Sequence, residues 1–387
     1  MAGRLDLARR LAVGAVCAAF VSLAVAGVHG WPQAAAQQKP AKKDPGAKAD
    51  EPWPEPAKLA ERRVAAENLP LFKSQETLEF TLTSDFGAIN RDRDPKSTKQ
   101  FPGTLQVTGG AGAPIPVQVG GRGHARRNPR VCDVVPIRLN FEKKDVAGTL
   151  FEGQGELKLV THCSSGVDGD QSVLSEYLTY RLYNLFTPRS FRARLVKVAY
   201  VDPKREPSPR PRYGMLLEDS DDLARRMEGR TYGVPNRLFN FVEPDSLLLM
   251  MMFQYMIANT DFSIMALHNV KLVQVKPMTL YPVPYDFDYS GFVNTGYGAV
   301  DKRLGLVSVR ERMYRGPCKT MAEYAPVLAV FNAKKDEVMA LVDQMPDMKP
   351  NRRKDARDFL EAFFAIASNP GKAKKTFVDE CVKAVGM

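Results

Sequence analysis

Hydrophobic and polar residues alternate over much of the chain between residues 71 and 219. In the run TLEFTLT, Leu78, Phe80 and Leu82 fall on one face of an extended chain, and similar short runs recur between Gly and Pro residues. Alternation of this kind is typical of strands with one buried face. The pattern predicts an antiparallel sheet that is interrupted by one helix over residues 171–186, where apolar residues recur at helical spacing.

After Asp219 the spacing of apolar residues becomes helical. The run at 247–258 is apolar all round and therefore predicted to be buried, with Asp245 as its cap, and it is too short to cross a bilayer. A short strand pair follows, and two amphipathic helices near the C-terminus are marked by Phe359, Phe363 and Ile366 and by Phe377, Cys381 and Val385. The prediction is an α+β fold with a strand-rich lobe over 71–222 and a mainly helical lobe over 223–387.

Two segments precede these lobes. Residues 1–36 carry three Arg residues, an apolar run from Leu11 to Val28 and the small-residue site Ala34-Ala35-Ala36, which is the order of a secretory signal cleaved after Ala36. An uncleaved membrane anchor is the alternative, because the apolar run is just long enough to reach across a bilayer, and membrane contact is expected only in that case. Residues 37–70, rich in Pro, Ala and Lys, are predicted to form a flexible tether.

The amino-acid composition adds one further indication, the net positive charge of the chain. With 44% hydrophobic and 26% charged residues, the 387-residue chain is neither disordered throughout nor a polytopic membrane protein. The net charge is +11, and loss of three Arg and one Asp with the signal leaves +9. A basic protein calls for an acidic partner. Without interleaved aromatic residues or a nucleic-acid-binding motif, an acidic envelope or an acidic protein substrate fits better than nucleic acid.

Four of the five cysteines lie after the signal, at positions 132, 163, 318 and 381. An even number of cysteines in an exported protein predicts disulfides and an oxidising compartment, which here means the periplasm, the cell envelope or the exterior. No two of them form a CxxC pair, so a structural zinc site is not favoured. We predict the pairs Cys132–Cys163 and Cys318–Cys381, because each pair falls within one predicted lobe.

A lysine on a strand is followed by a glutamate on the next helix. Lys158 lies in the strand GELKLV and Glu176 in the helix after it. A buried Lys held by a Glu is how many phosphoryl-transfer enzymes aim an ammonium group at nucleotide phosphates. The alternative is two exposed charges on neighbouring elements, which contribute little.

A polar cluster follows the buried helix, in MIANTDFSIMALHNVKLV. Asp261 at the end of this rigid element can orient a substrate hydroxyl, and Asn269 can supply a metal ligand. Asn-Thr-Asp is also good turn chemistry, and His268 can be a satisfied, partly buried side chain.

Two carboxylates then leave a short apolar strand in YPVPYDFDYSG. Asp286 and Asp288 lie two positions apart, so they point to the same side and repel each other. Buried carboxylates must be paired or bind a metal, and oxygen ligands suit Mg²⁺ or Mn²⁺ with phosphates completing the shell. In an exposed loop, both charges would be tolerated without a metal.

Two basic segments carry weaker signals. The Gly-rich loop GGRGHARRNPR (120–130) can hold phosphate with backbone amides and guanidinium groups, although such loops are also common surface hairpins. The segment SVRERMYRG (308–316) offers three Arg residues for an anion or, as the simpler alternative, a solvated helix face.

The order of these segments resembles the spore-coat protein H (CotH) kinase-like family, an atypical branch of the protein-kinase-like fold. The resemblance covers roughly residues 105–300. It rests on Arg122-Gly123, a Lys-bearing strand before a helix, the strand YGMLLED, an Asn-Thr-Asp turn with a downstream Asn, and a Pro-Tyr-Asp-Phe-Asp strand end. It implies a bilobal fold with one helix in the strand-rich lobe.

The resemblance also implies roles for individual residues. ATP would contact Lys158 and Arg122, with Glu176 positioning the lysine and Glu218 near the connection between lobes. Asp261 would take the catalytic carboxylate role. The divalent metal, Mg²⁺ or Mn²⁺, would be held by Asn269, Asp286 and Asp288.

The expected activity is transfer of the ATP γ-phosphoryl group to a hydroxyl, a Ser or Thr of a protein being the precedent of the family. Asn269 lies eight positions after Asp261, whereas protein kinases place the metal-binding Asn five positions after the catalytic Asp. This spacing and the scarcity of ATP outside the cytoplasm favour the alternative, a non-catalytic binding or scaffold protein of the cell envelope.

Overall fold

The computed structural model describes residues 52–381, apart from 111, 206–209 and 277–278. All of these residues belong to one compact unit. The predicted signal peptide and the first part of the predicted tether lie outside the described residues.

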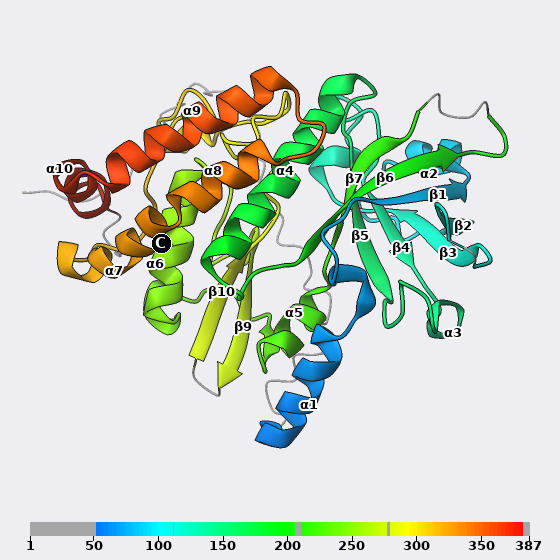
Figure 1. The fold of residues 1–387 in the computed structure, drawn as a ribbon, viewed down its shortest axis with the longest axis horizontal. Coiled ribbons are helices and arrows are strands. Elements are labelled where there is room, and N and C mark those ends of the chain that lie inside the picture. Colours follow the sequence, from blue (N-terminus) through cyan, green and yellow to red (C-terminus); the bar gives the residue numbers. More distant parts are fainter. Residues whose placement is uncertain (1–51, 111, 206–209, 277–278, 382–387) are drawn as a thin grey trace, which may run out of the picture. The chain divides into compact units, whose positions relative to one another are not determined.

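Seven strands of the N-terminal half close into a barrel with the order β1-β2-β3-β4-β5-β7-β6 (Figure 1). Their bounds are β1 (Leu78–Ser84), β2 (Phe101–Val107), β3 (Ile115–Gly121), β4 (Ile137–Asn140), β5 (Glu156–Thr161), β6 (Ala193–Val201) and β7 (Arg212–Leu217). Neighbouring strands are antiparallel except β1 and β6, whose parallel pairing closes the barrel. Leu78, Phe80 and Leu82 are buried in the barrel core, which confirms the face predicted from the alternation.

This architecture contradicts the predicted fold class. The sequence favoured a bilobal, protein-kinase-like fold with one helix in its strand-rich lobe, but the strands form a closed barrel. The same half also contains α2 (Phe86–Arg91) and α3 (Lys143–Val146) besides the long helix α4 (Val167–Phe186). Alternation reveals which face of a strand is buried but not which strand lies beside it, and a helix of four to six residues is too short to show a period.

Helix α4 begins four residues before the predicted start. It packs against β6 and β7 on one side and against α8 (Lys335–Asp343) on another, so it lies between the barrel and the C-terminal helices (Figure 1). A helix with neighbours on several sides needs apolar residues around most of its circumference. The predicted apolar positions that are buried are Val173, Leu174, Tyr177, Leu178 and Leu182.

The C-terminal half combines helices with a three-stranded antiparallel sheet of order β10-β9-β8. Its strands are β8 (Arg230–Tyr232), β9 (Val270–Lys276) and β10 (Thr279–Pro284), and its helices are α5 (Ser220–Arg226), α6 (Pro244–Met256), α7 (Met321–Ala333), α8, α9 (Pro350–Ala367) and α10 (Pro370–Ala373). Helix α6 is the buried helix that the sequence predicts. Its cap is Glu243 rather than Asp245, because Pro244 favours the first helical position and the Glu243 carboxylate accepts from two backbone amides.

Part of the predicted tether is folded. Residues Pro56–Glu67 form α1, which packs against α5, and Arg63 of α1 forms an ion pair of 2.9 Å with Glu228 in the turn that follows α5. The prediction of a flexible tether over 37–70 is therefore corrected for this helix. Leu59 and Ala66 are its buried residues, and two small anchors are too few to stand out from a Pro- and Ala-rich background.

Two disulfides confirm the predicted cysteine pairing. Cys132 and Cys163 are joined with their Cα atoms 4.7 Å apart, and Cys318 and Cys381 with theirs 5.0 Å apart. The first fastens the loop after β3 to the end of β5, and the second fastens the C-terminal segment to the stretch before α7. Two disulfides suggest an oxidising environment. Within the described residues, no helix is both long enough and apolar enough to cross a membrane.

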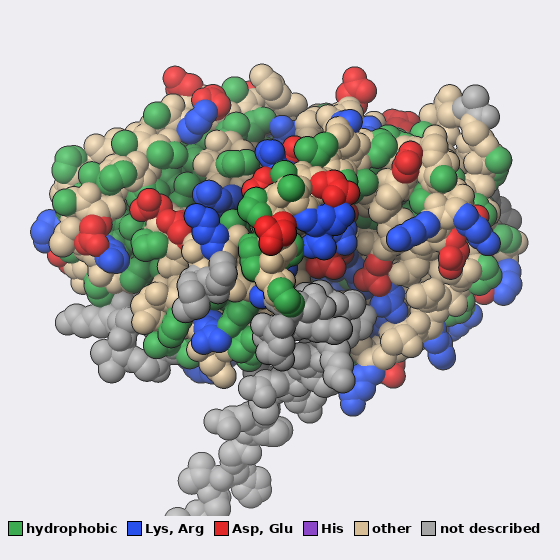
Figure 2. Space-filling view, turned by 90° about the horizontal axis from the view of Figure 1, so that it is seen from below, with side chains coloured by type: hydrophobic (Ala, Val, Ile, Leu, Met, Phe, Trp, Pro, Cys, Tyr) green, Lys and Arg blue, Asp and Glu red, His purple; other side chains and the backbone are tan. Residues whose placement is uncertain are grey.

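The excess of basic residues does not gather into one continuous surface on the face shown in Figure 2. There, Lys and Arg side chains alternate with Asp and Glu and are separated by apolar and uncharged groups. A mixed surface of this kind does not form a broad basic patch for a polyanion, so smaller clusters of charged residues within the fold are the better candidates for a binding site.

Candidate functional site

Three basic side chains lie where the end of the barrel meets α4 and the loop after β10. Lys158 is on β5, Arg122 directly follows β3, and Arg126 lies in the short 3-10 turn Ala125–Arg127. We call these three residues the cation row. The Lys158 ammonium lies 5.3 Å from the centre of the Tyr285 ring, just before Asp286.

Lys158 and Arg122 are poorly neutralised. The pKa of Lys158 is lowered to about 8, first by burial and then by the positive charges of Arg122 and Lys271. Burial also lowers the pKa of Arg122, although Asp286 opposes that shift. Among the described residues, neither side chain forms a hydrogen bond to a side chain or backbone group, and neither has a carboxylate within 4.0 Å. Partly buried cations without direct partners are typical of an anion-binding site.

Three carboxylates face the cation row. Glu176 projects from α4, and Asp286 and Asp288 follow β10; we call them the acid cluster. Burial raises the pKa of Glu176 well above its usual range, and the charges of Asp288 and Asp286 add to the effect. Burial and the charge of Asp286 raise the pKa of Asp288 to about 7. Repulsion within this cluster is relieved only in part by Arg122 and Arg126.

The acid cluster is largely without direct partners as well. Glu176 is 3% exposed, yet in the part of the chain that the structure describes its carboxylate has no ion pair and no hydrogen bond. The carboxylate of Asp286 likewise has none, whereas Asp288 accepts a hydrogen bond of 3.0 Å from the Tyr297 hydroxyl. The predicted ion pair between Lys158 and Glu176 is therefore not formed, although both residues belong to the same site.

Asp261 is held by a well-connected turn after α6. Its carboxylate oxygens lie 2.9 Å from His268 Nε2 and 3.0 Å from Asn269 Nδ2, which donates to it. The Asp261 amide donates to the side chain of Asn259, and Arg315 donates to the carbonyl groups on both sides of Asp261. Such bracing fixes the direction of a carboxylate, as an acid–base group requires.

Asn269 and Asp286 lie next to each other at one edge of the β8–β10 sheet. Asn269 immediately precedes β9 and Asp286 follows β10, and the Tyr285 amide donates to the Asn269 carbonyl at 3.0 Å. Both have a positive φ, 52° for Asn269 and 63° for Asp286, in the left-handed region that Asn and Asp adopt more readily than most residues other than Gly. Ala258 and Leu267, near Asp261, share this conformation.

Glu218 does not belong to this group. Its side chain is fully buried and pairs with Arg192 at 2.8 Å and with Arg226 at 2.7 Å. Both oxygens are also engaged in hydrogen bonds, including one from the Arg192 amide. The structure thus places Glu218 in a structural ion-pair clasp between the start of β6 and α5.

The basic segment 308–316 also has a structural use. Arg310 pairs with Asp355, and Arg312 stacks 3.9 Å from the Phe359 ring centre, while Arg315 supports the Asp261 turn. The segment is therefore neither an anion site nor a solvated helix face. Arg315 and Tyr297 carry no motif, and only their positions in the fold reveal their connection to Asp261 and Asp288.

The donor set fits a divalent metal only with the help of other ligands. Among the described residues, no three His, Cys, Asp or Glu side chains are placed to hold a metal by themselves. In this same part of the chain, Glu176 and Asp286 have no cationic partner within 4.0 Å, and the side-chain oxygen of Asn269 accepts no hydrogen bond while its amide nitrogen donates two. Mg²⁺ is commonly held by one or two carboxylates, with waters and substrate phosphates completing the shell. The residues present fit this second kind of site.

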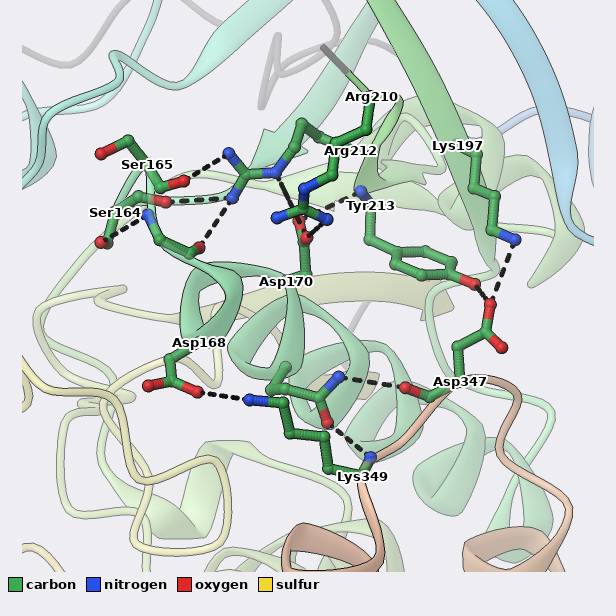
Figure 3. Close-up of polar contacts among 12 residues, drawn as sticks. Ser164, Ser165, Asp168, Asp170, Lys197, Arg210, Arg212, Tyr213, Asp347 and Lys349 are labelled. Atoms are coloured by element: carbon green, nitrogen blue, oxygen red, sulfur yellow. Dashed lines mark hydrogen bonds and ion pairs between the residues drawn. The ribbon is translucent and has the colours of Figure 1, made fainter. Parts of the chain in front are cut away.

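A second charge cluster provides a contrast. A cavity of about 540 Å³ lies between the barrel, the start of α4 and the loop before α9. Figure 3 shows charged and polar side chains that line it, among them Asp170, Lys197 and Asp347. There, Asp347 pairs with Lys197 at 3.1 Å and accepts from Tyr213, and Asp170 pairs with both Arg210 and Arg212. Each of these carboxylates is neutralised by a direct ion pair, as is typical of charges that only stabilise a fold. Direct pairing here and its absence between the cation row and the acid cluster distinguish the candidate site.

We expect Lys158→Met to stabilise the protein at pH 7. Because the pKa of Lys158 in the folded state is about 8 and the ordinary value is 10.5, the folded state disfavours the charged form. The cost is fully present below about pH 8 and disappears as the pH rises towards 10.5. The expected gain in the free energy of unfolding is about 1–2 kcal/mol at pH 7. Chemical denaturation at pH 7 and pH 10 would measure it, and a variant that loses stability at pH 7 would contradict this view of Lys158.

Comparisons with known proteins add little to this geometry. No protein-family model and no curated protein matches the sequence. Among solved structures, the crystal structure of CtkA, a proinflammatory kinase of Helicobacter pylori, is similar over 63% of this chain and 88% of that chain, with 12% sequence identity and a TM-score of 0.33. Likeness at this level carries no argument about fold or activity. Membership of the CotH kinase-like family stays a prediction from the motifs.

Proposed function

We propose that this protein binds ATP with a divalent metal and transfers the γ-phosphoryl group to a hydroxyl. The observation that carries the proposal is an arrangement of ionisable groups: in the part of the chain that the structure describes, the side chains of Lys158 and Arg122 form no hydrogen bond or ion pair, and neither do the carboxylates of Glu176 and Asp286 that lie opposite them. Groups that served only stability would pair, as they do around Asp170 and Asp347. A metal–phosphate ligand between the two sets would satisfy both.

The side chains fall into three roles. Lys158 and Arg122 bind phosphate oxygens, since ammonium and guanidinium groups both complement phosphate. Asp286, Asp288 and Asn269 hold the metal, Mg²⁺ or Mn²⁺, which when bound neutralises charge on the phosphates. Asp261, directed by His268 and Asn269, accepts the proton of the attacking hydroxyl.

The acceptor and the setting follow from the resemblance and the composition. We propose a Ser or Thr of a protein as the acceptor, and the net charge of +11 favours an acidic protein or an envelope component. The two disulfides support a location outside the reducing cytoplasm. Glu218 has no part in this proposal, because its ion-pair clasp occupies it fully.

Nucleotide binding by the disulfide-bonded protein tests the proposal. Titration with ATP in the presence of Mg²⁺ or Mn²⁺ should raise the melting temperature, and Lys158→Met and Arg122→Met should each weaken ATP binding at least about tenfold, the loss expected for a buried charge-assisted contact. Lys144→Met and Arg130→Gln, at exposed positions, serve as matched controls. No effect of ATP on the unmodified protein would refute the proposal.

Transfer itself needs a separate measurement. With γ-labelled ATP and dephosphorylated casein as a generic Ser/Thr acceptor, we expect label on the acceptor or on the protein itself. Binding of ATP without any transfer of label would instead support the non-catalytic binding protein.

A further inference from the structure

We infer that Tyr180 positions Asp286 to hold the divalent metal, and that it does so through the backbone of Asp286 rather than through the carboxylate. The inference rests on the proposed function and adds to it a residue that no motif marks. Tyr180 lies on α4, and Asp286 follows β10, 106 residues later along the chain. Only the assembled fold brings the two residues together.

A buried hydrogen bond joins Tyr180 to Asp286. The Asp286 amide donates to the Tyr180 hydroxyl at 2.9 Å, just after the pairing of β10 with β9 has ended at Pro284. Tyr180 is 2% exposed, so water competes little for this bond, and a buried amide without an acceptor is costly. The tyrosine hydroxyl therefore supplies the acceptor that the strand pairing no longer provides.

The chain around Asp286 is fixed at three successive residues. The Tyr285 amide donates to the Asn269 carbonyl at 3.0 Å, and the Asp286 amide donates to Tyr180. The Phe287 ring is fully buried and packs edge-on against the Tyr180 ring, with 4.8 Å between the ring centres. Tyr180 thus holds two of the three residues, one with its hydroxyl and the other with its ring.

The backbone sets the direction of the Asp286 carboxylate. In the described part of the chain, no hydrogen bond or ion pair reaches that carboxylate, so no side chain orients it. Its direction follows from the main chain, which has a φ of 63° at Asp286. A metal ligand has to be held in place by the groups around it, and loss of such an outer partner weakens metal binding about 10–100-fold.

Helix α4 also offers a matched tyrosine without this role. Glu176 and Tyr180 are four positions apart, so both lie on the face of the helix that meets the site. Tyr183 is buried as well, but its ring packs against Phe253 of α6, and its hydroxyl forms no hydrogen bond with any described residue. Loss of the Tyr183 hydroxyl therefore removes no contact to the site.

Nucleotide binding with and without metal tests the inference. Calorimetric titration with adenylyl imidodiphosphate, a non-hydrolysable analogue of ATP, is carried out in Mn²⁺ and again in EDTA, and the ratio of the two Kd values measures the contribution of the metal. We expect the unmodified protein to bind at least about tenfold more tightly in Mn²⁺. Tyr180→Phe keeps the ring and removes only the hydroxyl, so it should lower this ratio to about two or less while the Kd in EDTA changes less than about twofold.

The control variant separates positioning from stability. Tyr183→Phe should retain the full ratio, and the melting temperature of each variant without ligands shows whether its fold is intact. A merely structural hydroxyl would change the melting temperature and leave the ratio unaltered. A full ratio in Tyr180→Phe, or an equal fall of the ratio in both variants, overturns the inference while the proposed function stands. If the unmodified protein binds the nucleotide equally with and without Mn²⁺, the metal role in the proposed function fails, and the inference fails with it.

Discussion

Asp261→Asn should lower the rate of phosphoryl transfer by about 10³-fold while the Kd for ATP changes less than twofold. General base catalysis contributes roughly 10²–10⁴-fold, and an amide of the same shape cannot accept the proton of the attacking hydroxyl. Two donors hold the carboxylate, His268 at 2.9 Å and Asn269 at 3.0 Å, so the negative charge is oriented rather than free to rotate. Single-turnover transfer of label from γ-labelled ATP measures the chemical step directly.

The matched control for this experiment is an exposed aspartate on a helix. Asp358 on α9 is 63% exposed and pairs with Lys354 on the same surface, so Asp358→Asn should leave transfer unchanged. A transfer rate in Asp261→Asn equal to that of the unmodified protein would remove Asp261 from the reaction. Loss of ATP binding in the same variant would assign it to the ligand-binding part of the site instead.

Glu218→Ala should lower the free energy of unfolding by about 3–5 kcal/mol. The Glu218 side chain is fully buried between two guanidinium groups, at 2.8 Å from Arg192 and 2.7 Å from Arg226. Removing the shared carboxylate leaves two buried positive charges that repel each other, and breaking a buried ion pair from one side is costly for this reason. Denaturant unfolding would show the loss as a shift of the midpoint.

A surface ion pair provides the comparison for Glu218. Glu337 is 53% exposed and pairs with Lys334 one helical turn away, so Glu337→Ala should change stability by less than about 0.5 kcal/mol. Unchanged stability in Glu218→Ala together with weaker ATP binding would favour the nucleotide-binding role that the motif implies over the structural clasp.

The motifs predicted which residues lie together in the site, but they did not predict the contacts that those residues make. Lys158, Arg122 and Glu176 do lie in one site, but the lysine and the glutamate form no ion pair, and Glu218 is engaged elsewhere. A motif indicates that residues occur in a given order along the chain. It holds no information about whether two side chains are close enough to neutralise each other.

Residues that support the site were missed for the same reason. Arg315 and Tyr297 reach Asp261 and Asp288 from a long irregular stretch after β10, and Arg126 reaches Thr161 across a loop. Each of these three residues is separated from the group that it contacts by a long stretch of chain or by a loop whose shape the sequence does not reveal. Arginines are also common on surfaces, so composition cannot separate a supporting arginine from a solvated one.

The sequence by itself determined the elements whose pattern is local. Alternation placed Leu78, Phe80 and Leu82 on a buried face, helical spacing located α4 and α6, and the grouping of cysteines into lobes identified both disulfides. Tertiary structure alone decided that the strands close on themselves, because β1 pairs with β6 more than a hundred residues later and no local period encodes that neighbour. It also decided that Lys158 and Arg122 lie opposite Glu176 and Asp286 without forming an ion pair with any described residue. That property depends on distances between α4, β5 and the loop after β10, which only the assembled fold sets.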